Sequence, residues 1–458
     1  MKTISYTLLH CILLACCTNI QAQETSLTSG DKFTLEDFSI RLEQVTFPPS
    51  YIWVSSGYTT VNPSHRTVMG VEEFFAPPFA ARKFRLRVNL QADSILQILD
   101  VGDEGHNRGG GKYLLYADGI WFPHKITRFG TYHYLYKGKP VSLGVTSELI
   151  PLYGQAGFVE KIVIRNRSSE SVNLKIMPEL IPGQPTVIPL NQWGYSVPGS
   201  KTAFAQQSSE RRWQNEATNI GLYCERENAV LEPGQSVTTR ITVLMNRTND
   251  PLPEQVDAAI LEHRSVEAWR TRLTAYTQNI PALESNIAGL DDYYKRSVIS
   301  GLVCLWENPD YVLNPHLASC GMDGGAMCAY LWDDAGYAPN MVSMMLGDHV
   351  RKVAKTMADV DLERYYAFAP DGSGVGVKYS YNTWAFTRLV DAVFKFIKPD
   401  RELYDECKRL ILNDEKRKDG NNLIDYGYQR NLLEMRSSGW EHYVVSPNAE
   451  RSWCLKRL

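Results

Sequence analysis

Residues 237–278 read "VTTRITVLMNRTNDPLPEQVDAAILEHRSVEAWRTRLTAYTQ" and contain a change of hydrophobic period. At 237–245 apolar and polar residues alternate, which is the period of a strand with one buried face. The stretch 253–278 is instead rich in Ala, Leu, Glu and Arg, which favour a long helix. The sequence therefore predicts a β region that passes into a helical region after Pro251.

Strand patterns recur upstream of this point. Residues 84–90, "FRLRVNL", and residues 172–178, "VNLKIMP", alternate in the same way. Turn-forming residues punctuate the region at 116–121, 165–171 and 231–236. Many short alternating runs predict an N-terminal antiparallel β-sandwich, which we place at residues 35–250.

Helical patterns dominate the rest of the chain. We expect a linker helix within residues 251–283, followed by six or seven helices within residues 284–458. Apolar residues fall on one helical face at 290–306 and again at 384–397. Long polar or glycine-rich connections, at 307–326, 367–381 and 418–428, are the usual places for functional residues.

The composition limits the possible partners. The chain has 458 residues, enough for two or three domains, and 48 basic against 51 acidic residues. Without a basic stripe, no nucleic-acid partner is expected. No Cys-x-x-Cys pair or other metal-ligand spacing occurs, so no metal or other cofactor is expected. Cys320 and Cys328 could form a disulfide; the alternative is that both are small buried residues.

The first residues predict export. Lys2 precedes an apolar run from Ile4 to about Cys17, and Ala22 supplies the small residue of a cleavage site, so residues 1–22 are a signal peptide. The expected location is the periplasm or the extracellular space. The alternative is a lipoprotein box at residues 13–16, which would leave a lipidated Cys16 and anchor the protein at the cell envelope.

A first candidate site lies in "CGMDGGAMCAYLWDDAGYAPNMV", residues 320–342. An indole beside carboxylates suits a sugar, because the C–H face of the sugar packs on the ring and its hydroxyls donate to the acids. We therefore expect Trp332, Asp333 and Asp334 to bind substrate. If Asp333 faces a cavity, Asp334 lies toward its rim, since adjacent helical residues point about 100° apart. The alternative is that the acids satisfy a helix N-terminus.

A second candidate site lies in "EMRSSGWEHYVVSPNAERSW", residues 434–453. Glu441 follows an indole that can partly desolvate its carboxyl and raise its pKa, so Glu441 is the candidate general acid. The alternative is a surface glutamate after a turn. Asp425 could equally be a helix N-cap, and His442 a structural residue. The further residues expected to bind substrate here are Asp425, Trp440, His442, Asn448 and Glu450.

These segments resemble those of the six-hairpin glycosidase superfamily. "AYLWDDAGYAPNMV", residues 329–342, resembles the Tyr-Trp-Asp-Ser segment of trehalases and the Leu-Trp-Asp segment of glucosidase-I and mannosylglycerate-hydrolase relatives. "SSGWEHYVVSPN", residues 437–448, resembles the Glu-Ser-Gly-Trp-Asp segment that carries the general acid of trehalases. The resemblance implies an (α/α)6 barrel, often preceded by a β-sandwich. It places Trp332 and Asp333 in the sugar subsite and the acid at Glu441, with Glu in place of Asp.

Residues 284–458 are too few for the six helix pairs of such a barrel, so the resemblance implies an incomplete (α/α)6 toroid. The base of these enzymes comes from late in the barrel and is expected to be missing. We therefore expect a C-terminally truncated chain that is inactive as it stands. An inverting hydrolase needs two carboxyl groups about 6.5–9.5 Å apart with water between them.

The sequence thus favours an exported glycoside hydrolase that cleaves an oligosaccharide or polysaccharide, by inversion. One alternative is a polysaccharide lyase on the same toroid, for which Tyr443, His442 and Arg436 are available. Another is a non-catalytic glycan-binding protein.

Overall fold

The computed structural model describes residues 32–42, 52–64, 67–82, 84–93, 95–97, 119–187, 190–191, 205–207, 211–318, 327–427 and 442–458. Of these, residues 33–458 belong to one compact unit. The predicted signal peptide, with Cys16, therefore lies outside the described residues, and so do Cys320, Arg436, Trp440 and Glu441.

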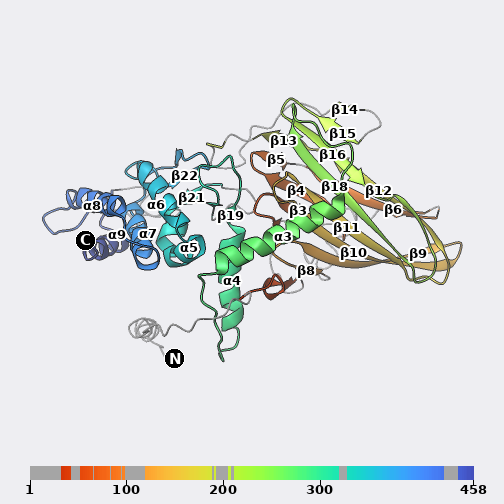
Figure 1. Cartoon of the computed structure of the whole chain (residues 1–458), viewed down its shortest axis with the longest axis horizontal. Coiled ribbons are helices and arrows are strands. Elements are labelled where there is room, and N and C mark those ends of the chain that lie inside the picture. Colours follow the sequence, from red (N-terminus) through yellow and green to blue (C-terminus); the bar gives the residue numbers. More distant parts are fainter. Residues whose placement is uncertain are drawn as a thin grey trace. The chain divides into compact units, whose positions relative to one another are not determined.

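Two antiparallel sheets occupy the N-terminal part of the unit (Figure 1). The first has the strand order β1 (Ile40–Arg41), β8 (Gly119–Trp121), β9 (Ile126–Tyr136), β10 (Lys139–Pro151), β11 (Gly157–Asn166), β18 (Ser236–Arg247), β16 (Thr218–Cys224), β15 (Arg212–Gln214) and β14 (Ala205–Gln207). The second has the order β13 (Gln184–Val187), β5 (Phe79–Arg82), β4 (Val71–Ala76), β6 (Arg85–Ala92), β12 (Val172–Ile181) and β17 (Asn228–Leu231). Strands β2 (Val54–Ser55), β3 (Thr60–Pro63) and β7 (Ile95–Gln97) extend it at its sides.

The two sheets share one hydrophobic core. In β6 every second residue is buried, as the alternation predicts, and Leu86 and Val88 belong to the same buried cluster as Leu143 of β10 and Phe158 of β11. Phe158 also packs edge-on against Phe74, with ring centroids 5.7 Å apart. Each such aliphatic or aromatic side chain contributes roughly 1.5–3 kcal/mol on burial. The predicted antiparallel β region is confirmed.

Helix α3 (Ala258–Thr277) begins where the hydrophobic period changes. The carboxylate of its N-cap, Asp257, accepts a hydrogen bond from the Ile260 N–H at 3.0 Å. The helix lies against strands β10, β11 and β18 (Figure 1). The predicted helix within residues 253–278 is confirmed.

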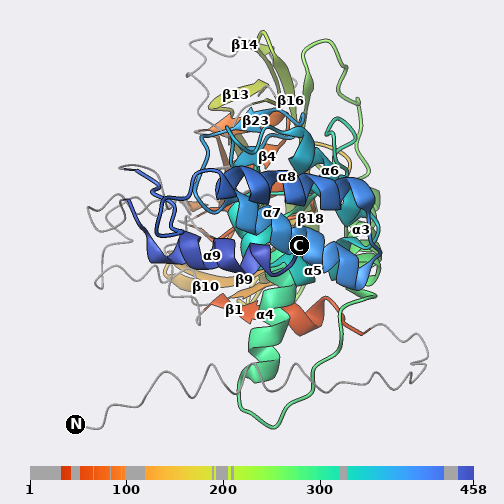
Figure 2. The ribbon, with the colours of Figure 1, turned by 90° about the vertical axis from the view of Figure 1, so that its left-hand side faces the viewer.

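The remaining helices gather around α7 (Asn382–Phe396). Helices α5 (Pro339–Leu346), α6 (His349–Asp359), α8 (Arg401–Glu415) and α9 (Val445–Leu455) all contact it, and Figure 2 shows α7 between α8 and α9. The π-helix η5 (Leu331–Tyr337) also packs on α7. With α4 (Leu290–Val303), the described residues after 284 contain six α-helices and one π-helix, and the predicted order of β then α is confirmed.

Short strands pair between segments of this helical part. One of them shows that part of the helix prediction was wrong. Residues 305–306 were expected to continue a helix, but form β19 (Leu305–Trp306), paired with β20 (His316–Leu317). Strand β22 (Ala367–Phe368) pairs with both β21 (Ala329–Tyr330) and β23 (Gly374–Val375). Trp306 is fully buried against Phe75, with ring centroids 5.6 Å apart, because the tertiary contact outweighs local helix preference.

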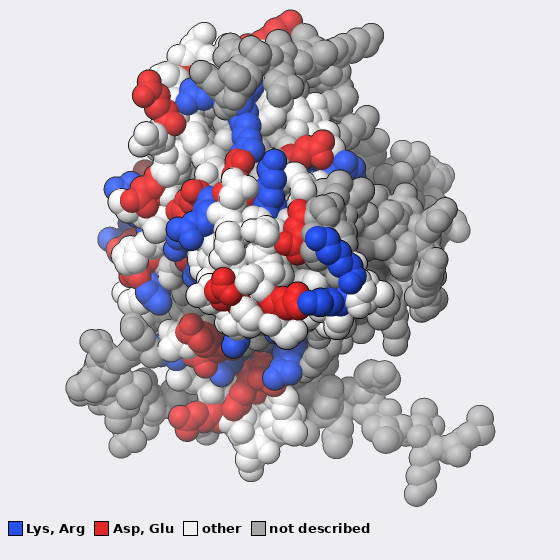
Figure 3. All heavy atoms as spheres, turned by 90° about the vertical axis from the view of Figure 1, so that its right-hand side faces the viewer, with Lys and Arg blue, Asp and Glu red and all other residues white. Residues whose placement is uncertain are grey.

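The surface carries mixed charge. On the face shown in Figure 3, basic and acidic side chains lie interspersed over the described residues, without a large area of one sign. Among the described residues no helix is both long enough and apolar enough to cross a bilayer.

A buried ion pair connects the sheets to the helices. Arg272 of α3 is 4% exposed, and its Nε donates to Glu307 Oε1 at 3.0 Å. Its other nitrogens donate to the backbone oxygens of Ser56, at 3.0 Å, and Leu305, at 2.7 Å. Its guanidinium also lies over the ring of Trp269, 4.6 Å from the centroid. One side chain thus holds the β2–β3 turn, α3 and β19 together.

The surroundings of Glu307 favour its charged form, which pairs with the Arg272 cation. The hydroxyls of Tyr276, at 2.7 Å, and of Tyr153 also donate to its carboxylate. Burial opposes ionisation, but Arg272 and the two tyrosine hydroxyls outweigh it and lower the pKa of Glu307. The carboxylate is therefore charged and fully engaged at neutral pH.

We predict that Arg272→Ala lowers the free energy of unfolding by roughly 3–5 kcal/mol, because it leaves Glu307 buried without its cation. Urea unfolding followed by circular dichroism measures this. Arg270→Ala is the matched control: it lies in the same helix, in an exposed pair with Glu267, and should cost no more than about 1 kcal/mol. Equal midpoints for the two variants would contradict the assigned role of Arg272.

Candidate functional site

The segment with the first candidate site forms a π-helix rather than an ordinary helix. Ala338 N donates to Asp333 O, five residues back, which is the π-helical pattern. Pro339 then starts α5, where its missing N–H costs nothing. Single π-helical turns are rare and occur often at functional sites. In this one, Trp332 packs toward α7, whereas Asp334 lines a cavity beside α5.

Four rings form what we call the aromatic platform: Trp332, Tyr337, Tyr381 and Trp384. The Trp332 ring lies 4.4 Å from that of Tyr381, 4.8 Å from Tyr337 and 6.0 Å from Trp384, centroid to centroid. Both indoles are half-buried, and Tyr337 is 67% exposed. The platform therefore offers accessible aromatic surface.

Sequence reasoning missed Tyr381 and Trp384. The apolar period of residues 384–397 was assigned to the core, and Trp384 stands at its first residue. The available signal was Trp384 with Arg388 one helical turn later, since the Arg388 guanidinium lies over the Trp384 ring at 5.1 Å. An arginine on the same helical face as the indole indicates that this face is not wholly part of the core, because arginine is seldom fully buried.

Asp333 lies close to a group of tyrosines behind the platform. Tyr379 stacks on Tyr381 at 5.5 Å, and Tyr366 packs on Tyr379 at 4.8 Å. Burial, followed by the charges of Tyr379, Tyr366 and Asp333, raises the pKa of Tyr381. The buried Tyr381 hydroxyl has no hydrogen-bond partner within the described chain.

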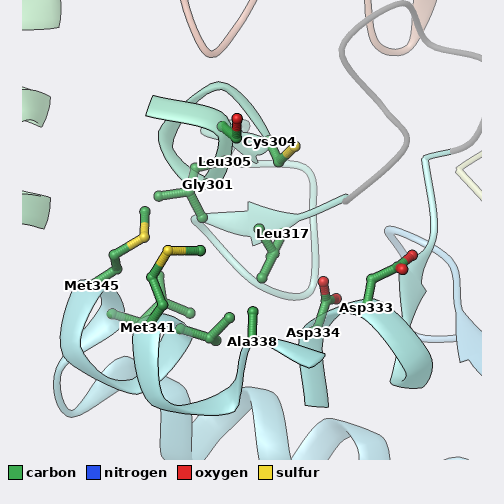
Figure 4. Close-up of a pocket in the computed structure, with 12 residues that line it drawn as sticks. Gly301, Cys304, Leu305, Leu317, Asp333, Asp334, Ala338, Met341 and Met345 are labelled. Atoms are coloured by element: carbon green, nitrogen blue, oxygen red, sulfur yellow. The ribbon is translucent and has the colours of Figure 1, made fainter. Parts of the chain in front are cut away.

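Asp334 occupies the opposite side of η5. It lines a cavity of about 220 Å³ together with Asp333 and residues of α4, α5 and β20 (Figure 4). We expected Asp334 near the rim, but it is 2% exposed and the more buried of the two acids. The wider π-helical turn changes the directions in which adjacent residues point, so the 100° argument does not hold here. Burial and the neighbouring charge of Asp333 raise the pKa of Asp334 well above its usual value.

Of the second candidate site, the structure describes Asp425, His442, Asn448 and Glu450. Both carboxylate oxygens of Asp425 lie 3.0 Å from His442 Nδ1, and Asp425 also accepts from the Gly427 N–H at 2.8 Å. The hydrogen bond from His442, followed by that from Gly427, lowers the pKa of the exposed Asp425. Asp425 thus closes a turn here instead of capping a helix.

Asn448 holds the loop of Asp425 against α9. Its Oδ1 accepts from Ile424 N at 2.9 Å, and its Nδ2 donates to the backbone oxygens of Ile424, at 3.2 Å, and Val444, at 3.0 Å. Both ends of the amide are therefore engaged with the backbone. A role in binding substrate stays a prediction.

Glu450, on α9, is a carboxyl whose pKa is raised toward neutral pH. Burial raises its pKa from 4.5 to about 7, against an opposing effect of Arg388. Its Oε2 is buried without a hydrogen-bond partner in the described part of the chain. Because Arg388 also stacks on Trp384, Glu450 faces the same stretch of α7 that carries the aromatic platform.

Helix α7 is thus what brings the two sequence segments together. Both η5 and α9 pack on it, and Trp384 and Arg388, four residues apart, lie on one helical face. Trp440 and Glu441 lie outside the described residues, so their predicted roles are untested. Among the residues described, no group of three or more His, Cys, Asp or Glu is placed to hold a metal ion.

Comparisons with known proteins give weak similarities only. No protein-family model and no curated protein matches the sequence. One similar solved structure is assigned as a kojibiose phosphorylase from the human microbiome: TM-score 0.44, 10% identity, 93% of this chain and 64% of that chain. Another is a bacterial glucoamylase complexed with acarbose: TM-score 0.36, 9% identity, 79% of this chain and 57% of that chain. The chain spans less than two thirds of either protein.

The raised pKa of Glu450 predicts a pH-dependent contribution to stability. The folded state binds the proton more tightly than the unfolded state, so this contribution is present below pH 4.5 and is lost as pH rises to about 7. Relative to Glu450→Gln, the wild type should lose about 1–2 kcal/mol between pH 4.5 and 8, a figure reduced for solvent screening.

Urea midpoints at several pH values measure this difference. Glu254→Gln, at an exposed position, is the control and should follow the wild type throughout. A Glu450→Gln profile parallel to that of the wild type would show that Glu450 titrates normally.

Proposed function

We propose that this chain is an exported glycoside hydrolase that cleaves an oligosaccharide and whose helical part forms a portion of an (α/α)6 toroid. The observation that carries the proposal is the aromatic platform, with Asp333 on one side and Glu450 facing the same helix. The motif resemblance of residues 329–342 and 437–448 supports the same reading.

In this proposal the platform holds the sugar. Apolar C–H faces of a pyranose pack on the half-buried rings of Trp332 and Trp384. Asp333 then accepts hydrogen bonds from the sugar hydroxyls, and its charge strengthens these bonds. Sugars need this combination because each ring has apolar faces and a polar edge.

Protonation of the leaving oxygen is assigned to Glu441, by its place in the trehalase-like segment. Glu450 is a second carboxyl suited to donate a proton, because a pKa of about 7 leaves much of it protonated near neutral pH. A carboxyl with this pKa is also partly ionised at neutral pH, so the pKa alone does not exclude Glu450 as the base of an inverting reaction. The base remains unassigned.

We predict that a glycan panel will identify an oligosaccharide whose affinity falls at least about tenfold in Trp332→Ala and in Trp384→Ala, because each variant removes a stacking surface. Isothermal titration with the full chain measures this. Tyr404→Ala is the matched control: Tyr404 is also half-buried under an arginine, Arg401 at 5.3 Å, but lies on α8. It should bind like the wild type.

Turnover is then measured with the same glycan, and any release of sugar would show that the expectation of an inactive chain is wrong. Glu441→Gln should lower release of reducing sugar by at least about a hundredfold while leaving affinity nearly unchanged. If Glu450→Gln abolishes turnover and Glu441→Gln does not, the acid assignment moves to Glu450. Absence of any glycan that binds or stabilises the chain would overturn the proposal.

Two other outcomes point to different functions. An unsaturated product with ultraviolet absorbance would indicate a polysaccharide lyase, and the hydrogen bond that orients His442 against Asp425 is the observation that favours this second candidate. Glycan binding without any release of sugar, unaffected by Glu441→Gln, would indicate a glycan-binding protein.

A further inference from the structure

The cavity beside Asp334 differs from the aromatic platform in position and in character. Its walls come from α4, β19, β20, η5 and α5, and Trp332 does not line it. Apart from the two acids, the lining is mostly apolar and includes Leu317, Met341 and Met345 (Figure 4). Such walls suit an apolar body better than a sugar.

The shape of the cavity depends on Gly301 of α4. A Cβ at this position would lie 2.9 Å from Met345 Sδ and 3.1 Å from Met341 Cε. The glycine therefore leaves room for both methionine side chains along the wall. At about 220 Å³, the cavity exceeds the roughly 150 Å³ that suffices for benzene in an engineered apolar cavity. The exposed Ser300 and half-buried Met341 also line it, so it is reached from solvent.

A buried carboxyl group, that of Asp334, lines part of the cavity wall. Asp334 is 2% exposed, lines the cavity, and within the described chain its Oδ2 has no hydrogen-bond partner. Buried polar atoms in proteins are nearly always paired, so an unpaired one that lines a cavity marks the place of a ligand group. In Figure 4 the carboxyl points from the helix toward the side on which Leu317 lies.

The charged groups that line the cavity indicate whether the ligand group is a cation or an anion. The titratable groups that line it are Asp333 and Asp334 from η5 and the thiol of Cys304, the C-cap of α4. Neither α5 nor β20 contributes one, and no Lys, Arg or His is among the described lining residues. Two adjacent acids repel each other when both are ionised, and a cation between them removes that repulsion.

We propose that this cavity binds a small primary amine, with its apolar body against Met341 and Met345 and its ammonium group donating to Asp334 Oδ2. The neighbouring Asp333 adds to the attraction, and the methionine sulfurs give a soft, adaptable wall. This site shares Asp333 with the proposed glycan site, but none of the four platform rings lines it, and its test involves no sugar.

The proposal predicts how affinity depends on pH. Burial and Asp333 raise the pKa of Asp334, so a cationic amine must displace the proton of this carboxyl in order to bind. Below the pKa of Asp334, the Kd of an amine should therefore fall about tenfold for each unit by which pH rises. A neutral molecule of the same shape has no such dependence and gains nothing from ionised acids.

The test compares benzylamine with benzyl alcohol on the full chain, by isothermal titration at pH 6, 7 and 8. We expect saturable 1:1 binding of benzylamine, at least tenfold tighter than that of benzyl alcohol at pH 8, with an affinity that rises with pH until Asp334 is ionised. Asp334→Asn keeps the side-chain shape, removes the charge and should weaken benzylamine at least tenfold.

A second variant guards against misfolding of the first. Ala338→Leu fills part of the cavity, since Ala338 lines it, and should weaken both probes alike. The urea midpoint of each variant reports whether it is folded; that of Asp334→Asn should match or exceed the wild type at pH 8, because a buried acid forced to ionise destabilises the fold. Equal affinity for the two probes, or unchanged benzylamine affinity in a folded Asp334→Asn, would overturn the proposal. So would a failure of benzylamine to bind.

Discussion

The buried pair of Arg272 and Glu307 is the interaction on which the rest of the structure depends. Taking two charges out of water costs several kcal/mol for each, so the pair persists only where every donor and acceptor is satisfied. Here the backbone oxygens of Ser56 and Leu305 complete the shell of the arginine. Gly57 is part of the same solution: its φ is +82°, and a Cβ there would lie 2.3 Å from Arg272 Cζ.

Fixing β19 against the sheets has consequences further along the chain. Leu305 and Trp306 follow α4 directly, and their pairing with β20 sets where Leu317 lies beside α5. The cavity beside Asp334 is therefore built on the same contact that joins the β and helical parts. Helix α7 plays the corresponding part for the aromatic platform, because it carries Trp384 and receives both η5 and α9.

The pKa values of carboxyl groups in this protein are shifted in different directions by their surroundings. Asp425 is exposed and hydrogen-bonded by His442 and Gly427, so its pKa is lowered. Asp334 is buried and Glu450 half-buried, and each has an oxygen atom without a partner in the described chain, so their pKa values are raised. Desolvation opposes charge and hydrogen bonding to the charged form favours it. Ionisation and chemical role are thus set by packing rather than by residue type.

The sequence by itself determined the alternating strands at 172–178 and 237–245, the helix within 253–278 and the order of the β and helical parts, because each depends on a local period of burial. It also indicated Trp332 and Asp333 as candidate sugar-binding residues, because an indole stands next to a carboxylate there. Only the tertiary structure decided the π-helix, the depth of Asp334 and the contact of Trp332 with Trp384. A local pattern tells which face of a segment is buried, whereas the partner of that face is chosen by packing between residues far apart in the chain.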